Sequence, residues 1–148
     1  MIHTVETAKQ LLALPAAALA AGDLAQVLGR LAPGDGSWLY RWDAACTAAP
    51  NGGTVLAPDG QPACGRWLLC HDGTVDARCF GVFGPETPAD DALDALMADS
   101  SVRCIRFGTD VNFTQRHTFT RGGVTLDFTG RQVTACGFAP ARHNDPFG

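Results

Sequence analysis

Apolar and polar residues alternate in short runs along much of the chain, and glycine, proline, asparagine or aspartate bounds most of these runs. The clearest run is 38–42, where Trp38, Tyr40 and Trp42 occupy every second position and therefore share one face of an extended strand. The pattern predicts a β-rich fold with tight turns. Strands are expected at 24–28, 38–42, 54–57 and 66–70, and then at 102–107, 118–120, 124–128 and 132–135.

Near the N-terminus the pattern changes to helical spacing. Thr4 can cap a short helix that continues through Leu14, because its hydroxyl can accept a hydrogen bond from an otherwise unpaired backbone N–H. Glu6 favours the positive end of the helix, and Pro15 ends it.

A second helix is predicted near the middle of the chain. Thr87 is expected to cap it, Pro88 to occupy its first helical position, and Asp90 to act as the answering residue of a capping box. Apolar residues then recur at helical spacing, at Leu93, Leu96 and Met97, and the helix is expected to extend to Asp99. The carboxylates of Asp90, Asp91 and Asp94 are interpreted as helix-start chemistry, in preference to a metal site or an acid–base pair.

Composition narrows the classes of partner. The chain has 148 residues, a net charge of −4 and a single lysine, so no basic patch is available to neutralise nucleic-acid phosphates. No apolar run approaches the roughly 20 residues of a membrane span. Six cysteines lack paired spacing and a convincing export signal, which favours reduced thiols over a disulfide framework. One domain or two small ones fit this length.

Motifs that carry chemistry are sparse. We find no Cys-x-x-Cys or His-x-x-x-His pair, no nucleophile elbow and no phosphate or dinucleotide loop, so no catalytic residue, metal site or cofactor is predicted. Glycoside cleavage requires two carboxylates, and only Asp127, with Arg131 nearby, offers a candidate. A solvated strand-face acid is the preferred interpretation of Asp127. The aromatic face of Trp38, Tyr40 and Trp42 could stack on a sugar, but core or subunit packing is favoured.

The order of several segments resembles the N-terminal regions of phage tail spikes and tail fibres of the pectate-lyase-like, right-handed β-helix superfamily. The resemblance rests on the sequences LAPGDG at 31–36, YRWDA at 40–44, NGGTV at 51–55 and GRW at 65–67, followed by the Phe80-Gly81 step and the acidic helix. Family members usually carry Gly-Asp-Gly-Val-Thr-Asp-Asp-Thr after that step. This chain retains only Gly84 and the pair Asp90-Asp91.

The resemblance implies a mainly β fold in two parts. Residues 1–74 would form a small α+β attachment or head module, and 75–148 a capping helix followed by the first rungs of a right-handed parallel β-helix. Such a chain would be structural: it would attach a tail spike to a tail or baseplate protein in the virion tail and support a homotrimer that recognises host-surface polysaccharide. Catalytic residues of such enzymes lie on middle rungs, which this chain lacks.

Two other functions remain open. The chain could be a fragment or short relative of a polysaccharide lyase or glycoside hydrolase, a depolymerase, or it could be a free-standing β-rich binding module. In the tail-spike interpretation, Trp38, Tyr40 and Trp42 form a candidate subunit-packing face. The open end of a short β-helix would require either more chain beyond Gly148 or another subunit to cover it.

Overall fold

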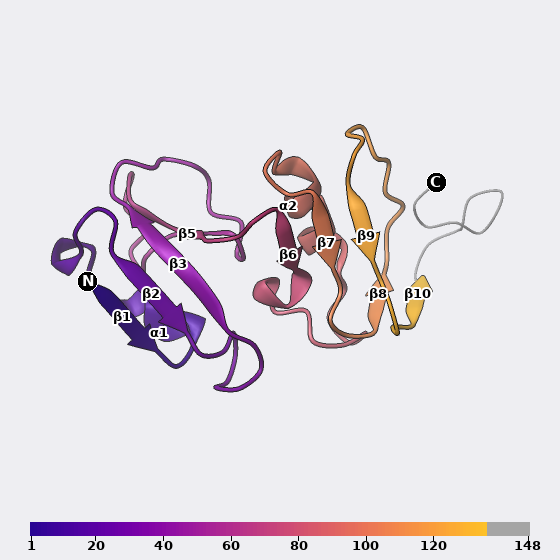
Figure 1. Ribbon diagram of the computed structural model, residues 1–148, viewed down its shortest axis with the longest axis horizontal. Coiled ribbons are helices and arrows are strands. Elements are labelled where there is room, and N and C mark those ends of the chain that lie inside the picture. The colour runs from indigo at the N-terminus through magenta and orange to yellow at the C-terminus, as the bar shows by residue number, and fades with distance from the viewer. Residues whose placement is uncertain (136–148) are drawn as a thin grey trace. The chain divides into compact units, whose positions relative to one another are not determined.

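The computed structural model describes residues 1–135 and is mainly β, with two short α-helices among its described elements (Figure 1). The chain divides into two compact units, Met1–Cys70 and His71–Gly148. This division says nothing about the functions predicted for residues 1–74 and 75–148, which stay predictions.

The first unit is built on one five-stranded sheet. Its elements are β1 (Ile2–Val5), α1 (Ala8–Ala13), the 3₁₀ turn η1 (Ala16–Ala18), β2 (Leu24–Val27), β3 (Trp38–Asp43), β4 (Val55–Leu56) and β5 (Arg66–Leu69). The strand order is β1-β2-β3-β5-β4. β1 and β2 are parallel, which requires the crossover that α1 supplies, and the remaining pairs are antiparallel.

The N-terminal helix begins later than predicted. Residues Ile2–Val5 pair with β2 as an edge strand, so Thr4 is a strand residue and not a helix cap. Thr7 caps α1 instead, and its hydroxyl accepts from the Gln10 amide at 3.3 Å. The pairing of β1 with β2 joins residues that are 22 positions apart, and the local helical pattern of the sequence cannot predict it.

The aromatic face of β3 lies inside the first unit. Tyr40 is 1% exposed and Trp42 is 3% exposed, while Trp38 packs against the same core. Trp67 of β5 contacts Trp42 with ring centroids 5.3 Å apart, and the Tyr40 hydroxyl donates to the Gly53 carbonyl at 2.6 Å. Of the alternatives for this face, Tyr40 and Trp42 follow core packing and cannot form a subunit-packing or sugar-stacking surface, whereas Trp38 is only partly buried. The unit is large enough to bury these rings itself, because its other strands and α1 supply the cover.

The second unit is a set of parallel strands. Its described elements are β6 (Thr74–Asp76), the 3₁₀ turn η2 (Ala77–Phe80), α2 (Asp90–Ala98), β7 (Cys104–Arg106), β8 (Val111–Phe113), β9 (Thr125–Asp127) and β10 (Val133–Ala135). One sheet has the order β6-β7-β9, and a second joins β8 to β10. All three pairs are parallel.

From β6 to β7 the chain returns to the first sheet after 30 residues, a length that includes α2, and the two returns after α2 are shorter and nearly equal. Cys104 of β7 pairs with Thr125 of β9, an offset of 21 residues, and Val111 of β8 pairs with Val133 of β10, an offset of 22. Side chains consequently stack in rows across the strands. In the inward row, Val75 and Ile105 are buried, and Leu126 at the end of the row is half-buried.

Two strand predictions in this unit require correction. Residues 118–120 are not a strand, and β8 at Val111–Phe113 was not predicted. β8 is three residues long, too short for an alternating pattern to stand out, and its pairing with β10 decides its conformation. The segment containing 118–120 packs beside α2 instead, through contacts described next.

Candidate functional site

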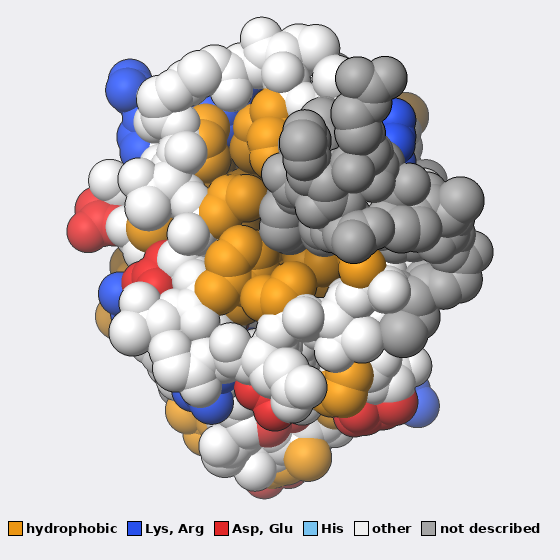
Figure 2. Space-filling view, turned by 90° about the vertical axis from the view of Figure 1, so that its right-hand side faces the viewer, with side chains coloured by type: hydrophobic (Ala, Val, Ile, Leu, Met, Phe, Trp, Pro, Cys, Tyr) orange, Lys and Arg blue, Asp and Glu red, His pale blue; other side chains and the backbone are white. Residues whose placement is uncertain are grey.

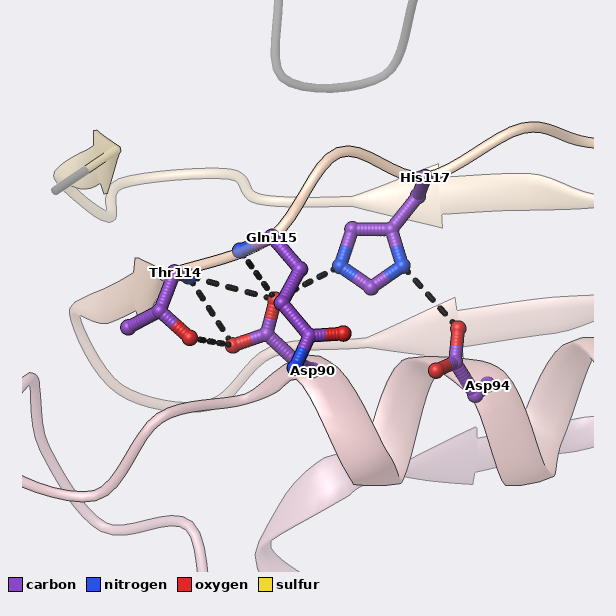
Figure 3. Close-up of polar contacts among 5 residues, drawn as sticks. All are labelled: Asp90, Asp94, Thr114, Gln115 and His117. Carbon is purple, nitrogen blue, oxygen red and sulfur yellow. Dashed lines mark hydrogen bonds and ion pairs between the residues drawn. The ribbon is translucent and has the colours of Figure 1, made fainter. Parts of the chain in front are cut away.

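The most organised polar site of the described chain joins α2 to the segment 114–121 (Figure 3). The carboxylate of Asp90, the first residue of α2, is 3% exposed. It accepts hydrogen bonds from the Thr114 amide and hydroxyl, both at 2.9 Å, and from the Gln115 amide at 3.0 Å. His117 Nε2 lies 2.7 Å from the same carboxylate. Asp90 thus gathers backbone and side-chain donors from residues more than twenty positions away.

His117 is held between two carboxylates. Its ring is 4% exposed, and its Nδ1 lies 2.9 Å from Oδ1 of Asp94, one turn further along α2. Each ring nitrogen faces a carboxylate, which only accepts, so only the doubly protonated imidazolium donates to both. The edge of Phe113 packs against the ring at a centroid distance of 5.6 Å. The site is an Asp–His–Asp bridge on an apolar base.

The environment of Asp90 favours its charged form. Burial raises the pKa of this carboxyl, but the hydrogen bonds from Thr114, His117 and Gln115 outweigh that effect and lower the pKa below its ordinary value of 3.8. Asp90 is therefore ionised near neutral pH. The groups that donate to Asp90 occupy the carboxylate lone pairs that a general base would use to accept a proton.

The far end of the segment is fixed to the other end of the helix. Arg121 donates to the carbonyls of Met97 at 2.9 Å, Leu96 at 3.1 Å and Val102 at 2.7 Å. A guanidinium there adds donors to carbonyls of the last turn of α2 and of the chain just after it, and it complements the negative end of the helix dipole. Segment 114–121 is thus tied to both ends of α2.

The start of α2 differs from the prediction. The helix begins at Asp90, its N-cap position is Ala89, and no side chain caps it there. Thr87 and Pro88 are exposed and precede the helix. Asp90 does not complete a capping box either, because its carboxylate is directed to Thr114, Gln115 and His117. Tertiary donors have displaced the local cap that the sequence predicts.

Two hollows flank the bridge, but neither brings together groups that activate one another. One, of about 220 Å³, is lined by residues that include Asp94, His117 and Arg121. The other, of about 350 Å³, is lined by residues that include Asp90 and Thr114. Both ring nitrogens of His117 and the donors of Asp90 are already engaged. Asp90 and His117 therefore fix segment 114–121 on α2, whereas the carboxylate of Asp94 is 62% exposed.

A Ser–His–Asp group elsewhere in the second unit has its hydrogen bonds in the wrong direction for nucleophilic catalysis. Ser101 Oγ lies 3.4 Å from His71 Nε2 but donates to Asp99 at 2.6 Å. His71 Nδ1 accepts from the Gly73 amide at 3.0 Å, which places the proton of a neutral ring on Nε2. The imidazole therefore cannot accept the serine proton in this geometry, as an activating base must.

Asp127 is not a poised acid. Hydrogen bonds from Thr129 lower its pKa first, and Arg106 lowers it further, whereas a glycosidase acid requires a raised pKa. Its cationic neighbour is Arg106, with Nε at 3.7 Å from Oδ2, rather than Arg131. Within residues 1–135, no group of three or more His, Cys, Asp or Glu side chains is arranged to hold a metal ion. No helix in the same range is long and apolar enough to cross a membrane.

No pattern in the sequence predicts the bridge. His117 is separated from Asp94 by 23 residues and from Asp90 by 27, and no spacing rule links them. The sequence predicts Asp90 and Asp94 on one helix as helix-start carboxylates, but Asp90 is buried, and only Asp94 is exposed. A buried histidine can be recognised as a partner only once segment 114–121 is placed against α2.

Comparison with known proteins gives a likeness in fold. No protein-family model and no curated protein matches the sequence. Among solved structures, the chain is similar to the tailspike protein gp49 of Acinetobacter baumannii bacteriophage Fri1, a capsular polysaccharide depolymerase. The TM-score is 0.65 and the identity 20% over 84% of this chain. The chain shares the fold of part of a phage tailspike. It spans 22% of that protein's length.

Proposed function

We propose that this chain is the structural N-terminal part of a phage-type tail spike, located in the virion tail. The observation that carries the proposal is the likeness in fold to a tailspike over 84% of the chain. The order of the segments in the sequence points the same way. In this proposal the first unit attaches the spike to a tail or baseplate protein, and the second begins the part that reaches toward host-surface polysaccharide.

The second unit would be the start of a right-handed parallel β-helix of the pectate-lyase-like type. Support comes from the parallel pairing of β6, β7 and β9, the separate pairing of β8 with β10, and the offsets of 21 and 22 residues. Two parallel sheets visited in turn are what a coil of rungs requires. Helix α2 would cap the start of the coil, and the Asp90–His117–Asp94 bridge would fix the cap to the chain that follows β8.

The end of the stack supports a continuation of this architecture. Leu126, in the last described rung, is half-buried, whereas its partner Ile105 is fully buried. Phe119 and Val133 are each 37% exposed. Figure 2 shows hydrophobic side chains gathered on the side of the molecule where β9 and β10 lie in Figure 1. Further rungs or another subunit would remove this apolar surface from water.

The length of the native gene product tests the proposal. A tail spike requires a chain several times longer than 148 residues, with more short strands at the same spacing after β10. Antibodies raised against the first unit should then label the tail of intact virions. A native product that ends near Gly148 and is absent from virions would contradict the proposal and favour a free-standing binding module.

A depolymerase is the second candidate, because the similar structure is described as a capsular polysaccharide depolymerase. The described residues supply no pair of carboxylates with the required properties, so the enzyme activity would belong to a longer form of the chain. Incubation of this segment and of the full-length product with capsular polysaccharide separates the two functions. Release of oligosaccharides by the segment alone would assign catalysis to it.

A further inference from the structure

Two cysteines of the first unit are brought side by side where β3 and β5 diverge. The antiparallel register of these strands ends at the pair Asp43 and Arg66. Just beyond it, the amide of Gly65 donates to the carbonyl of Cys46 at 2.8 Å. Cys64 precedes Gly65 directly, so the same hydrogen bond places its backbone next to that of Cys46.

The buried side chain of Arg66 holds both loops in place. It is 7% exposed, and its Nε donates to the Ala48 carbonyl at 2.8 Å. Its Nη1 donates to the carbonyls of Pro62 at 2.9 Å and Gly65 at 2.8 Å. One guanidinium thus bonds to the loop that contains Cys46 and to the loop that contains Cys64.

Gly65 fixes the turn more tightly still. Its φ of 96° lies in the region that favours glycine, and a Cβ there would approach the ring of Trp42 to 2.7 Å. The ring is buried in the core and cannot retreat. The Cys64–Gly65 backbone is therefore seated on the core and does not drift away from Cys46.

This geometry suits a disulfide. With a trans peptide and a near-linear hydrogen bond, standard bond lengths keep the Cα atoms of Cys46 and Cys64 within about 6 Å. Disulfides usually join Cα atoms about 4.4–6.8 Å apart. Both side chains are free thiols; Cys64 is exposed and Cys46 is half-buried. A reagent in solvent therefore has direct access to Cys64.

We propose that Cys46 and Cys64 are a redox pair that closes a reversible disulfide. In the first step the Cys64 thiolate attacks a small-molecule disulfide such as oxidised glutathione, forming a mixed disulfide and releasing one glutathione thiolate. The Cys46 thiolate then attacks the Cys64 sulfur and releases the second glutathione. The protein loses two protons and two electrons, which reduce oxidised glutathione to two molecules of glutathione.

The bridge would tie the end of β3 to the start of β5 and close the loop between them, which contains β4. Closure lowers the entropy of the unfolded chain and so stabilises the first unit, provided that the bond forms without strain. Under reducing conditions the thiols would re-form. The inference concerns the first unit alone and does not depend on the proposed function.

Tryptic digestion gives a direct test. Arg41 and Arg66 bound a peptide, 42–66, that contains Cys46 and Cys64 and no other cysteine. The folded chain is incubated with oxidised glutathione, alkylated and digested. We expect peptide 42–66 to lose two hydrogens, to carry no alkyl group and to regain both alkylation sites after reduction. Peptide 42–66 that carries two alkyl groups or two glutathiones would overturn the proposal.

Two variants complete the test. Cys64→Ser should prevent the loss of two hydrogens and leave Cys46 alkylated or in a mixed disulfide. Cys70→Ser removes another exposed thiol of the same unit and should leave bridge formation unchanged. Wild-type protein in denaturant provides the reference for unguided pairing. Bridge formation in peptide 42–66 that is no faster in the folded chain than in denaturant would also overturn the proposal.

Discussion

At the residue scale, the buried Asp90–His117 contact determines how the second unit is held together. Each side chain is 4% exposed, and hydrogen bonds keep the Asp90 carboxylate ionised in that setting. Burial of an unpaired charge is costly, whereas a close partner with additional hydrogen bonds offsets the cost. Asp94, at 62% exposure, completes the bridge from the solvent side. The contact therefore matters mainly because its loss would leave a buried carboxylate or a buried imidazole without its partner.

Asp90→Asn should strongly destabilise the second unit. The side chain of Asn has one acceptor oxygen in place of two. It cannot accept from Thr114, Gln115 and His117 together, so buried donors lose their acceptor. We expect a loss of about 3 kcal/mol in the free energy of unfolding, measured by urea denaturation. Asp91→Asn changes the exposed neighbouring carboxylate and is the matched control. Equal midpoints for the two variants would show that the bridge does not stabilise the fold.

The same contact predicts a dependence on pH. The pKa of Asp90 is lowered in the folded chain, so its contribution to stability is fully present above its ordinary value of 3.8 and is lost as pH falls through the folded value. The difference in unfolding free energy between wild type and Asp90→Asn should therefore shrink below about pH 4. Urea titrations at pH 7, 5, 4 and 3 measure it. A difference that grows on acidification would contradict the assignment.

At the scale of elements, helix starts are set by tertiary partners as much as by local caps. Thr7 caps α1 through its own hydroxyl, with the helix running to Ala13. At α2 the sequence offers Thr87 and Pro88, but the helix starts at Asp90 without a side-chain cap. Arg121 at the other end of α2 comes from a distant segment. Both ends of α2 therefore depend on residues 114–121.

Thr7→Ala and Thr87→Ala should consequently differ. Removal of the Thr7 hydroxyl eliminates an N-cap bond and should cost about 1 kcal/mol. Thr87 is exposed and caps no helix, so Thr87→Ala should change the stability by less than about 0.5 kcal/mol. Denaturation midpoints of the two variants, each compared with wild type, provide the measurement. A larger loss of stability for Thr87→Ala would show that Thr87 caps the helix after all.

At the scale of the whole molecule, the apolar surface near β9 and β10 is a candidate surface for self-association. Tyr40 and Trp42 of β3 cannot be part of an assembly surface, because they are buried in the first unit. A charge introduced at Trp42 would disrupt folding and says nothing about assembly. Self-association must use other surfaces, and the half-buried end of the parallel stack offers one apolar region with unpaired strand edges.

We expect the chain to self-associate as a trimer, in keeping with the proposed tail-spike role. Association would remove apolar surface and strand edges from water. Light scattering on the purified chain at micromolar concentration measures the mass. Val133→Lys should weaken association without loss of secondary structure, whereas Thr125→Lys, on an exposed outward position of β9, should not. A single-chain mass for the wild type would favour the free-standing module.

Local sequence patterns were enough to predict the mainly β class, the positions of β3 and β5, and a helix in the region of α2. These features depend on local alternation, turn residues and helical spacing, which neighbouring residues specify. The shared face of Trp38, Tyr40 and Trp42 was likewise readable, because side chains at every second position of a strand must lie together.

Long-range contacts determine what that face packs against, where α1 and α2 begin, and which partners His117 takes. β1 forms because β2 is beside it, and β8 forms because β10 is beside it. Asp90 changes from a helix-start carboxylate to a buried acceptor because segment 114–121 brings its donors. Each outcome depends on contacts between residues far apart in the chain, and local sequence patterns carry no information about such contacts.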